Sequence, residues 1–239
     1  METNLVIIPT YNEKENVELI VRAIDGLSTG FSILIVDDNS PDKTAEIVGR
    51  LQAEFPFLHL LSRQEKQGLG KAYLAGFDWA LQRDFSFIFQ MDADFSHNPS
   101  DLERLLEVSK NSGAVSIGSR YLNGTSIVNW PLFRLFLSFG ASKYVQWITG
   151  MKIKDPTAGF VCYPREALLA IELDKVQFKG YAFQIEMKFR SFVKGIPLKE
   201  IPIIFVDRTR GKSKMNSSII GEAIWGVIKL KYQQITRVL

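Results

Sequence analysis

Short apolar runs alternate along this chain with segments in which apolar residues recur every three or four positions. Runs rich in β-branched residues and bounded by turn residues are typical of buried strands, and the longer periodicity is typical of amphipathic helices. The pattern predicts strands at residues 4–11, 31–40, 58–63, 85–94 and 113–121. It predicts helices from Asn12 or Glu13 to about Ile24 and at residues 43–55, 68–82 and 99–111. This alternation predicts an α/β fold with a mostly parallel twisted sheet flanked by helices.

The pattern becomes less regular after residue 121. An aromatic-rich segment runs from Trp130 to Trp147, and a mixed segment contains "DPTAGFVCYP" and "EIPIIFVDRT". The last 24 residues place apolar side chains at helical spacing, followed by lysines and an arginine. No internal repeat or linker divides the chain. We expect one domain over residues 1–215 and an amphipathic helical extension over residues 216–239.

Composition narrows the class of protein. The 239 residues are 46% apolar, which is enough for a well-buried core, and the net charge of +3 is too small to indicate a nucleic-acid partner. One cysteine, Cys162, excludes an internal disulfide, and two histidines disfavour a histidine metal cluster. The chain starts without a basic, signal-like region and has no uncharged apolar stretch of about 18 residues. These features are typical of a soluble cytoplasmic protein.

Polar residues follow three of the predicted strands at their carboxyl ends, where open parallel sheets bind ligands. Asp92 and Asp94 come one residue apart, so an extended chain would point both carboxylates the same way. Two like charges that close require a countercharge, and Mg²⁺ or Mn²⁺ suits such oxygen ligands. His97 could join this metal or simply pack at a helix entry. The other two strand ends supply Pro9, Tyr11, Glu13, Asp37, Asp38 and Asn39, which could equally make turns and helix caps.

A divalent ion on two carboxylates suggests a substrate that carries phosphate. The segment "VDRTRGKSK" holds four basic residues around a glycine, and Arg208 and Lys214 could meet diphosphate charge, although a solvated loop is the alternative. Arg120, in "IGSRY", is either a further phosphate ligand or a surface arginine. "GLGKAYLAG" fits neither the phosphate loop nor the dinucleotide fingerprint and is better explained as a glycine entry to a helix.

Together, eight short blocks resemble the dolichyl-phosphate (polyprenyl-phosphate) mannosyltransferases, which belong to inverting glycosyltransferase family 2. The resemblance runs from about residue 5 to residue 215, and it depends on the order and spacing of the blocks. The blocks are "VIIPTYNEKEN", "ILIVDDNSPDKT", "QGLGKAYLAG", "MDADFSHNP", "GSRY", "DPTAGFVCYPREAL", "KGYAFQIEMKFR" and "EIPIIFVDRTRGKSK".

The resemblance implies a GT-A type fold, in which a Rossmann-like nucleotide-binding half joins an acceptor half within the catalytic domain. It implies a metal held by Asp92 and Asp94, and a catalytic role for this pair and Arg208. Arg134 falls where some members are thought to bind the lipid phosphate, although its neighbours Phe133 and Leu135 are less basic than in several relatives. The other residues that it places at the sugar nucleotide are Pro9, Tyr11, Glu13, Val36, Asp38, Ala93, Arg120 and Lys214.

The reaction implied is transfer of mannose from GDP-mannose to dolichyl or polyprenyl phosphate, with inversion and with Mg²⁺ or Mn²⁺. A phosphate acceptor is already largely dianionic at neutral pH, so no general base is expected. The alternatives are another donor, such as UDP-glucose, and a nucleotidyltransferase.

A lipid acceptor also implies contact with a membrane. The segment from Trp130 to Trp147 and the helical extension could lie in a bilayer interface, although core packing or a dimer seam explains either segment equally well. We expect peripheral attachment to the cytoplasmic face of a membrane, through these segments, a membrane-anchoring partner subunit or self-association.

Overall fold

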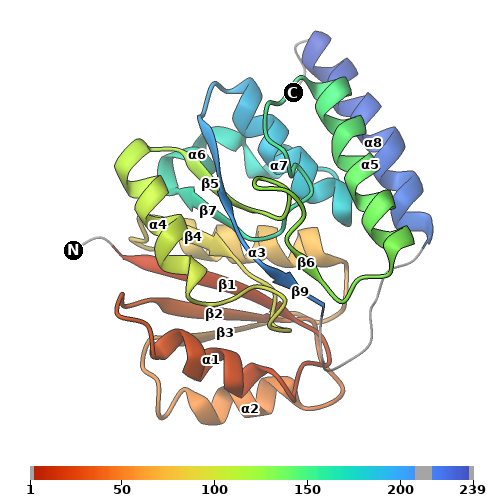
Figure 1. Cartoon of the computed structure of the whole chain (residues 1–239). Coiled ribbons are helices and arrows are strands. Elements are labelled where there is room, and N and C mark those ends of the chain that lie inside the picture. Colours follow the sequence, from red (N-terminus) through yellow and green to blue (C-terminus); the bar gives the residue numbers. More distant parts are fainter. Residues whose placement is uncertain (1–2, 208–216, 237–239) are drawn as a thin grey trace.

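The computed structural model describes residues 3–207 and 217–236 of the chain (Figure 1). Its strands are β1 Asn4–Thr10, β2 Ser32–Asp37, β3 Leu58–Ser62, β4 Phe87–Gln90, β5 Val115–Ser119, β6 Ile127–Val128, β7 Val161–Pro164, β8 Leu198–Pro202 and β9 Phe205–Val206. Its α-helices are α1 Val17–Asp25, α2 Thr44–Leu51, α3 Leu69–Leu81, α4 Asp101–Ser112, α5 Leu132–Thr149, α6 Arg165–Ile171, α7 Tyr181–Val193 and α8 Ser217–Ile235.

A seven-stranded sheet forms the centre of the molecule, in the order β3-β2-β1-β4-β7-β5-β8. Only β7 runs antiparallel to its neighbours β4 and β5, so the expectation of a mostly parallel sheet is confirmed. Strands β6 and β9 form a separate parallel pair. In the sheet, β1 lies between β2 and β4, so the chain moves outward from β1 first in one direction and then in the other. Such a reversal of strand order opens a crevice at the carboxyl ends of the two central strands.

Both faces of the sheet are buried. In β1, Leu5 and Ile7 join a core that contains residues of α3, α6 and α7, whereas Val6 and Ile8 join a second core that contains residues of α1, α2 and α4. All four side chains are fully buried. A strand covered by helices on both sides must be apolar at every position, and this requirement explains the continuous run "LVII".

Several predicted boundaries are wrong: the strand predicted at 31–40 ends at Asp37, the helix predicted at 43–55 ends at Leu51, and two further differences lie next to the strand ends that carry the predicted site. Helix α1 begins at Val17, because Asn12 adopts φ 58° and the Glu13 carbonyl accepts the N–H groups of Asn16 and Val17 in a turn. Strand β4 ends at Gln90, and Asp92 and Asp94 lie in the irregular segment that follows it. The alternation of side chains along a strand therefore does not apply to this pair.

The aromatic-rich segment and the C-terminal extension form α5 and α8, which lie side by side at one edge of the molecule (Figure 1). The hydroxyl of Tyr144 in α5 donates to the Ile224 carbonyl of α8 at 3.0 Å. Val227 and Leu230 of α8 are fully buried in the core that contains α7. Within the described ranges, neither helix nor any other has the length and hydropathy needed to cross a bilayer.

Candidate active site

A cavity of about 450 Å³ opens at the carboxyl ends of β1 and β4. The wall that faces these strand ends, called the opposite wall below, is made by residues that follow β5, by the loop before β7 and by the start of α7. The structure thus brings together side chains from segments that are far apart in the sequence. The predicted site residues that line it are Pro9, Tyr11, Glu13, Asp38, Asp92, Ala93, Asp94, Arg120 and Arg134.

The described residues that line the cavity include neither Val36 nor two predicted ligands that follow β9. The side chain of Val36 is fully buried in the core, where it packs near Gly76 of α3, so only its main chain could contact a substrate. The predicted ligands Arg208 and Lys214 lie outside the described residues.

The part of the cavity next to β1 and β2 combines acidic and basic groups. Arg63 donates to Asp38 at 2.7 Å, and the Lys66 ammonium lies 4.2 Å from the centre of the Tyr11 ring. Burial raises the pKa of Asp38, although the charge of Arg63 opposes that effect. Asp37 instead accepts hydrogen bonds from Thr10 and Ser40, so it holds the strand end in place and does not line the cavity.

The carboxylate pair follows β4. Asp94 accepts the N–H of Ser96 at 3.1 Å, which fixes the turn that carries it. The hydroxyl of Tyr73 donates to the Met91 carbonyl directly before the pair. Burial, and next the negative charge of Asp92, raise the pKa of Tyr73 well above its ordinary value, so this tyrosine stays neutral.

His97 packs beside the carboxylate pair. Its Nδ1 accepts the main-chain N–H of Asp92 at 3.4 Å, and its ring stacks on Phe160. Burial lowers the pKa of His97 to about 4, so the ring is neutral at pH 7. Because Nδ1 is engaged and the ring is stacked, the geometry favours the packing interpretation of this histidine.

A divalent cation fits the donor set that Asp92 and Asp94 provide. Among the described residues no group of three or more His, Cys, Asp or Glu side chains converges as a complete metal cluster. Mg²⁺ needs no such cluster, because it usually binds one or two carboxylates and takes its other ligands from substrate phosphates and water. Two hard carboxylates in a cavity wall meet that requirement.

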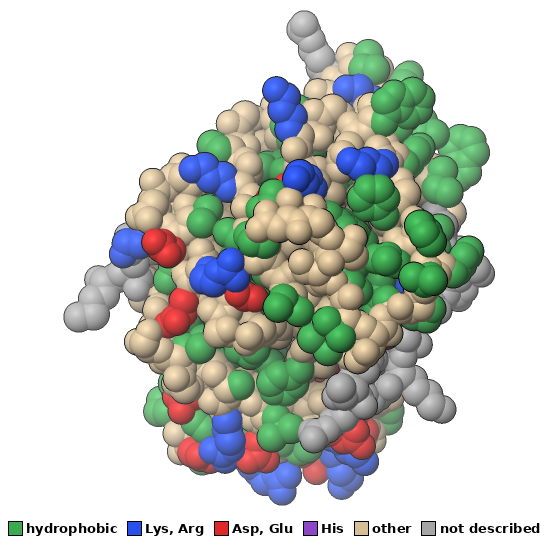
Figure 2. Space-filling model, in the orientation of Figure 1, with side chains coloured by type: hydrophobic (Ala, Val, Ile, Leu, Met, Phe, Trp, Pro, Cys, Tyr) green, Lys and Arg blue, Asp and Glu red, His purple; other side chains and the backbone are tan. Residues whose placement is uncertain are grey.

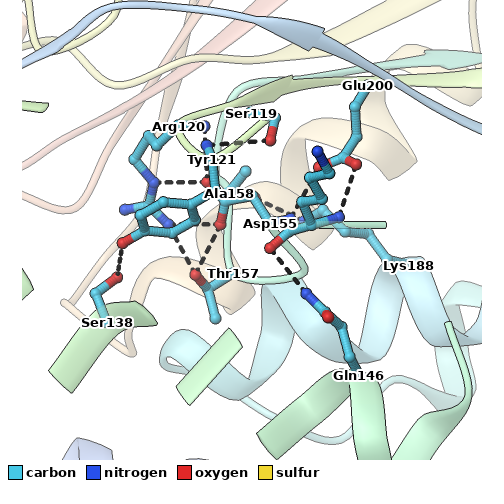
Figure 3. Close-up of polar contacts among 11 residues, drawn as sticks. Ser119, Arg120, Tyr121, Ser138, Gln146, Asp155, Thr157, Ala158, Lys188 and Glu200 are labelled. Carbon is cyan, nitrogen blue, oxygen red and sulfur yellow. Dashed lines mark hydrogen bonds and ion pairs between the residues drawn. The ribbon is translucent and has the colours of Figure 1, made fainter. Parts of the chain in front are cut away.

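Arg120 is held rigidly in the opposite wall (Figure 3). Its Nε and Nη2 donate to the two carboxylate oxygens of Asp155, each at 2.7 Å, and its own N–H donates to Asp155 at 3.0 Å. Asp155 is fully buried. Burial works to raise the pKa of Asp155, but the charge and hydrogen bonds of Arg120 outweigh it, so the net shift is downward. The guanidinium is therefore fixed in orientation and is not a surface group.

The loop that contains Asp155 is anchored from three elements (Figure 3). Glu200 of β8 accepts the N–H groups of Lys154 and Asp155 at 2.7 and 2.8 Å. Gln146 of α5 donates to the Lys154 carbonyl, and the buried Lys188 of α7 donates to the Ala158 carbonyl at 2.6 Å. This bonding makes the loop a rigid part of the cavity wall.

Arg134, the predicted lipid-phosphate ligand, lies where α5 meets the cavity. One guanidinium nitrogen donates to both carboxylate oxygens of Asp207 at 3.1 Å, and the group lies 4.0 Å from the centre of the Trp130 ring. Its neighbour Phe133 is 79% exposed. The arginine thus lies between the cavity and an exposed apolar surface.

Sequence reasoning missed several residues of the cavity and its support. Arg63, Asp155 and Lys188 lie within or next to segments that resemble the family, but no local pattern distinguishes them from ordinary charged residues. A buried charge must be paired, so the charged residues inside the apolar α7 pattern were the one signal available. Gln184 lies in the same helix, and no local pattern marked it either, because it carries no charge.

The sequence and the fold of the chain are similar to those of known glycosyltransferases. The pattern of glycosyl transferase family 2 matches residues 5–172. The chain is 45% identical over 232 residues to the polyprenol monophosphomannose synthase of Mycolicibacterium smegmatis, covering 95% of this chain and 88% of that protein. It is 43% identical over 225 residues to the undecaprenyl-phosphate mannosyltransferase of Micrococcus luteus, covering 94% and 92%.

Glucosyl-3-phosphoglycerate synthase from Mycobacterium tuberculosis, solved with Mn²⁺, UDP-glucose and phosphoglyceric acid, shares the fold. The TM-score is 0.66 at 17% identity, over 98% of this chain and 80% of that one, and the expected GT-A type architecture is confirmed. From the matched family pattern and the two long, closely similar relatives, it follows that the chain belongs to glycosyltransferase family 2.

Proposed function

We propose that this chain transfers mannose from GDP-mannose to a polyprenyl phosphate, with inversion at the anomeric carbon. The observation that carries this proposal is similarity over nearly the whole chain to two proteins named for mannose transfer to polyprenol or undecaprenyl phosphate. The cavity supports it, because its walls combine carboxylates near β1 and β4 with arginines from the opposite side. Two anionic substrates could be held there together.

The donor nucleotide would bind at the carboxyl ends of β1 and β2. Tyr11 and Lys66 offer an aromatic ring and a cation, and Asp38 offers a carboxylate that can accept hydrogen bonds from a base or ribose. Arg120 would face the sugar diphosphate with a guanidinium whose orientation Asp155 fixes. A donor that is fixed in advance costs little reorganisation as charge develops on the departing diphosphate.

Mg²⁺ or Mn²⁺ would be held by Asp92 and Asp94. When bound, the ion supplies positive charge that stabilises the diphosphate leaving group. The two carboxylates keep the ion at the β4 end of the cavity, and Ala93 between them leaves room for the nucleotide. Arg208 and Lys214 would add further positive charge, as the resemblance to the family implies.

The acceptor needs no deprotonation. A phosphate monoester, with a second pKa of about 6, carries close to two negative charges at pH 7, so it can attack the anomeric carbon directly. The task of the site is orientation and neutralisation of repulsion between two anions. Arg134 lies on the α5 side of the cavity and is suited to receive the acceptor phosphate in exchange for Asp207.

The acceptor lipid would reach the cavity along an exposed apolar face of α5 and α8. Figure 2 shows hydrophobic side chains gathered along the edge of the molecule where α5 lies. We propose that this α5–α8 apolar face attaches the chain peripherally to the cytoplasmic face of a membrane, with residues 216–239 as the amphipathic extension of a catalytic domain over 1–215. The members of this face are Leu132, Phe133, Phe136, Trp147, Trp225, Ile228, Tyr232 and Ile235.

Transfer of label to a lipid tests the proposed function. The purified chain is incubated with a short-chain polyprenyl phosphate and either GDP-mannose or UDP-glucose, each labelled in the sugar, and the label that enters organic solvent is measured. We expect Mg²⁺-dependent or Mn²⁺-dependent transfer of mannose with release of GDP, and loss of transfer in Asp92→Asn and after chelation. Transfer of glucose in place of mannose, release of pyrophosphate, or full activity after exhaustive chelation would contradict the proposal.

A further inference from the structure

Gln184, in the first turns of α7, lies in the cavity wall with its polar atoms unused. The side chain is only 3% exposed, and neither Oε1 nor Nε2 has a hydrogen-bond partner among the described residues. A buried amide without partners is destabilising, so such groups normally have a ligand or an ordered water.

The amide of Gln184 lies beside Gly159 of the loop before β7. A Cβ at that glycine would lie 3.7 Å from Gln184 Nε2 and 4.0 Å from His97 Cε1. Lys188 donates to the carbonyls of Ala158 and Gln184, at 2.6 and 3.1 Å, and so ties the Asp155 loop to the turn of α7 that carries the amide. The amide therefore has a fixed position between the loop and the carboxylate segment.

The chemistry of an amide limits what it can bind. Nε2 donates and Oε1 accepts, so the best partners are groups that do both. A hydroxyl satisfies either atom, and neighbouring hydroxyls on a sugar satisfy both at once. A phosphate oxygen only accepts and would leave Oε1 without a partner, and a neutral amide adds no charge to stabilise a diphosphate.

We propose that Gln184 binds hydroxyl groups of the donor sugar and contributes to the choice of sugar. The proposal rests on the proposed function for the location of the donor, with its diphosphate near Asp92 and Asp94. The sugar then extends from the carboxylate segment toward Gly159, where the amide replaces water at one or two hydroxyls.

Equilibrium binding provides the test, because it does not depend on turnover. GDP and GDP-mannose are titrated calorimetrically into wild type, Gln184→Leu and the control Gln90→Leu. Gln90 is a matched control, because it is also fully buried with neither amide atom partnered among the described residues, but it does not line the cavity. We expect Gln184→Leu to bind GDP as wild type does and GDP-mannose about 10–100-fold more weakly. Gln90→Leu should leave the ratio of the two dissociation constants unchanged.

Donors that lack single hydroxyls identify the contact. For at least one monodeoxy GDP-mannose, wild type and Gln184→Leu should bind equally, because the hydroxyl that the amide recognises is absent from both complexes. Equal GDP-mannose affinity in wild type and Gln184→Leu would overturn the inference, as would an equal loss for GDP itself. If wild type transfers a different sugar, the proposed donor is wrong, and the same ratio measured with that sugar nucleotide decides the role of Gln184.

Discussion

Asp155 is the residue whose single substitution should most disturb the cavity wall, because it is the buried partner of Arg120. Asp155→Asn leaves a guanidinium that is 8% exposed without its anion, and breaking a buried pair costs about 3–5 kcal/mol. We expect a loss of this size in the free energy of unfolding, measured by urea denaturation.

An exposed ion pair provides the control for this substitution. Arg22 and Glu54 form an equally short, two-bond pair on the surface, and Glu54→Gln should change stability little because water solvates both groups. Equal losses in Asp155→Asn and Glu54→Gln would show that burial does not control the strength of the Arg120 pair.

Lys188 should make stability depend on pH above neutrality. Burial lowers its pKa from 10.5 to about 7 in the folded chain, although the charges of Asp155 and Glu200 oppose this shift and that of Arg120 adds to it. Between these two pKa values the unfolded chain binds the extra proton, so the free energy of unfolding rises with pH across this window. Below about pH 7 both states are protonated and this contribution is constant.

Comparison with Lys188→Met isolates the contribution of this one group. The free energy of unfolding of wild type minus that of Lys188→Met should be flat below about pH 7 and should increase from about pH 7 to about pH 9. Denaturation at several pH values measures this difference. A difference that falls or stays constant over that range would mean that the lysine stays charged in its buried position.

At the scale of helices and strands, local pattern predicted the elements well and their ends less well. The predicted helices at 68–82 and 99–111 match α3 and α4 closely, because amphipathic periodicity is a property of the segment itself. The end of β4 and the start of α1 depend on which backbone groups find partners elsewhere, and residue pattern does not contain that information. The antiparallel β7, only four residues long, was not predicted for the same reason.

Gly76 determines how closely α3 approaches the sheet. A Cβ at this position would lie 2.7 Å from Ile7 Cγ2 of β1, so Gly76→Ala forces the helix and strand apart. Overpacking of this kind costs about 1–3 kcal/mol, and thermal or urea unfolding should show it. Gly49→Ala in α2 is the matched control, because nothing lies within 4 Å of its Cβ, and it should gain up to about 1 kcal/mol from helix propensity. If both substitutions stabilised the chain, the close packing of α3 on β1 would be disproved.

For the molecule as a whole, residue pattern located most directly the part of the cavity that lies at the carboxyl ends of the parallel strands, whereas Arg134 on α5 was placed there by the resemblance to the family. Residues after β1, β2 and β4 could be assigned from sequence because the carboxyl ends of such strands meet at one edge. Gln184 in the cavity wall and Asp155 behind Arg120 could not, because β7 reverses direction and α7 returns to the cavity from a distant part of the chain. Which of their side chains point inward is decided by tertiary packing.

The α5–α8 apolar face should bind membranes. Phe136 and Trp225 are 70% and 72% exposed, and they lie on helices that pack against each other at the edge of the molecule. Insertion of one such side chain into a bilayer interface stabilises binding by about 1.5–3 kcal/mol, which corresponds to roughly 10–100-fold in affinity. Phe136→Ser and Trp225→Ser should each weaken co-sedimentation with anionic lipid vesicles by this factor.

Leu169 of α6 provides the control that distinguishes binding through the α5–α8 apolar face from binding through any exposed apolar side chain. It is 57% exposed but lies outside the α5–α8 apolar face, so Leu169→Ser should bind vesicles as wild type does. All three variants should transfer mannose at the wild-type rate to a water-soluble, short-chain acceptor, because the substituted side chains do not line the cavity. Unchanged vesicle binding in Phe136→Ser and Trp225→Ser, or equal weakening in Leu169→Ser, would assign attachment to another surface or to a partner subunit. Weaker vesicle binding in Phe136→Ser and Trp225→Ser alone would support attachment through this face, from which the lipid acceptor would enter the cavity beside Arg134.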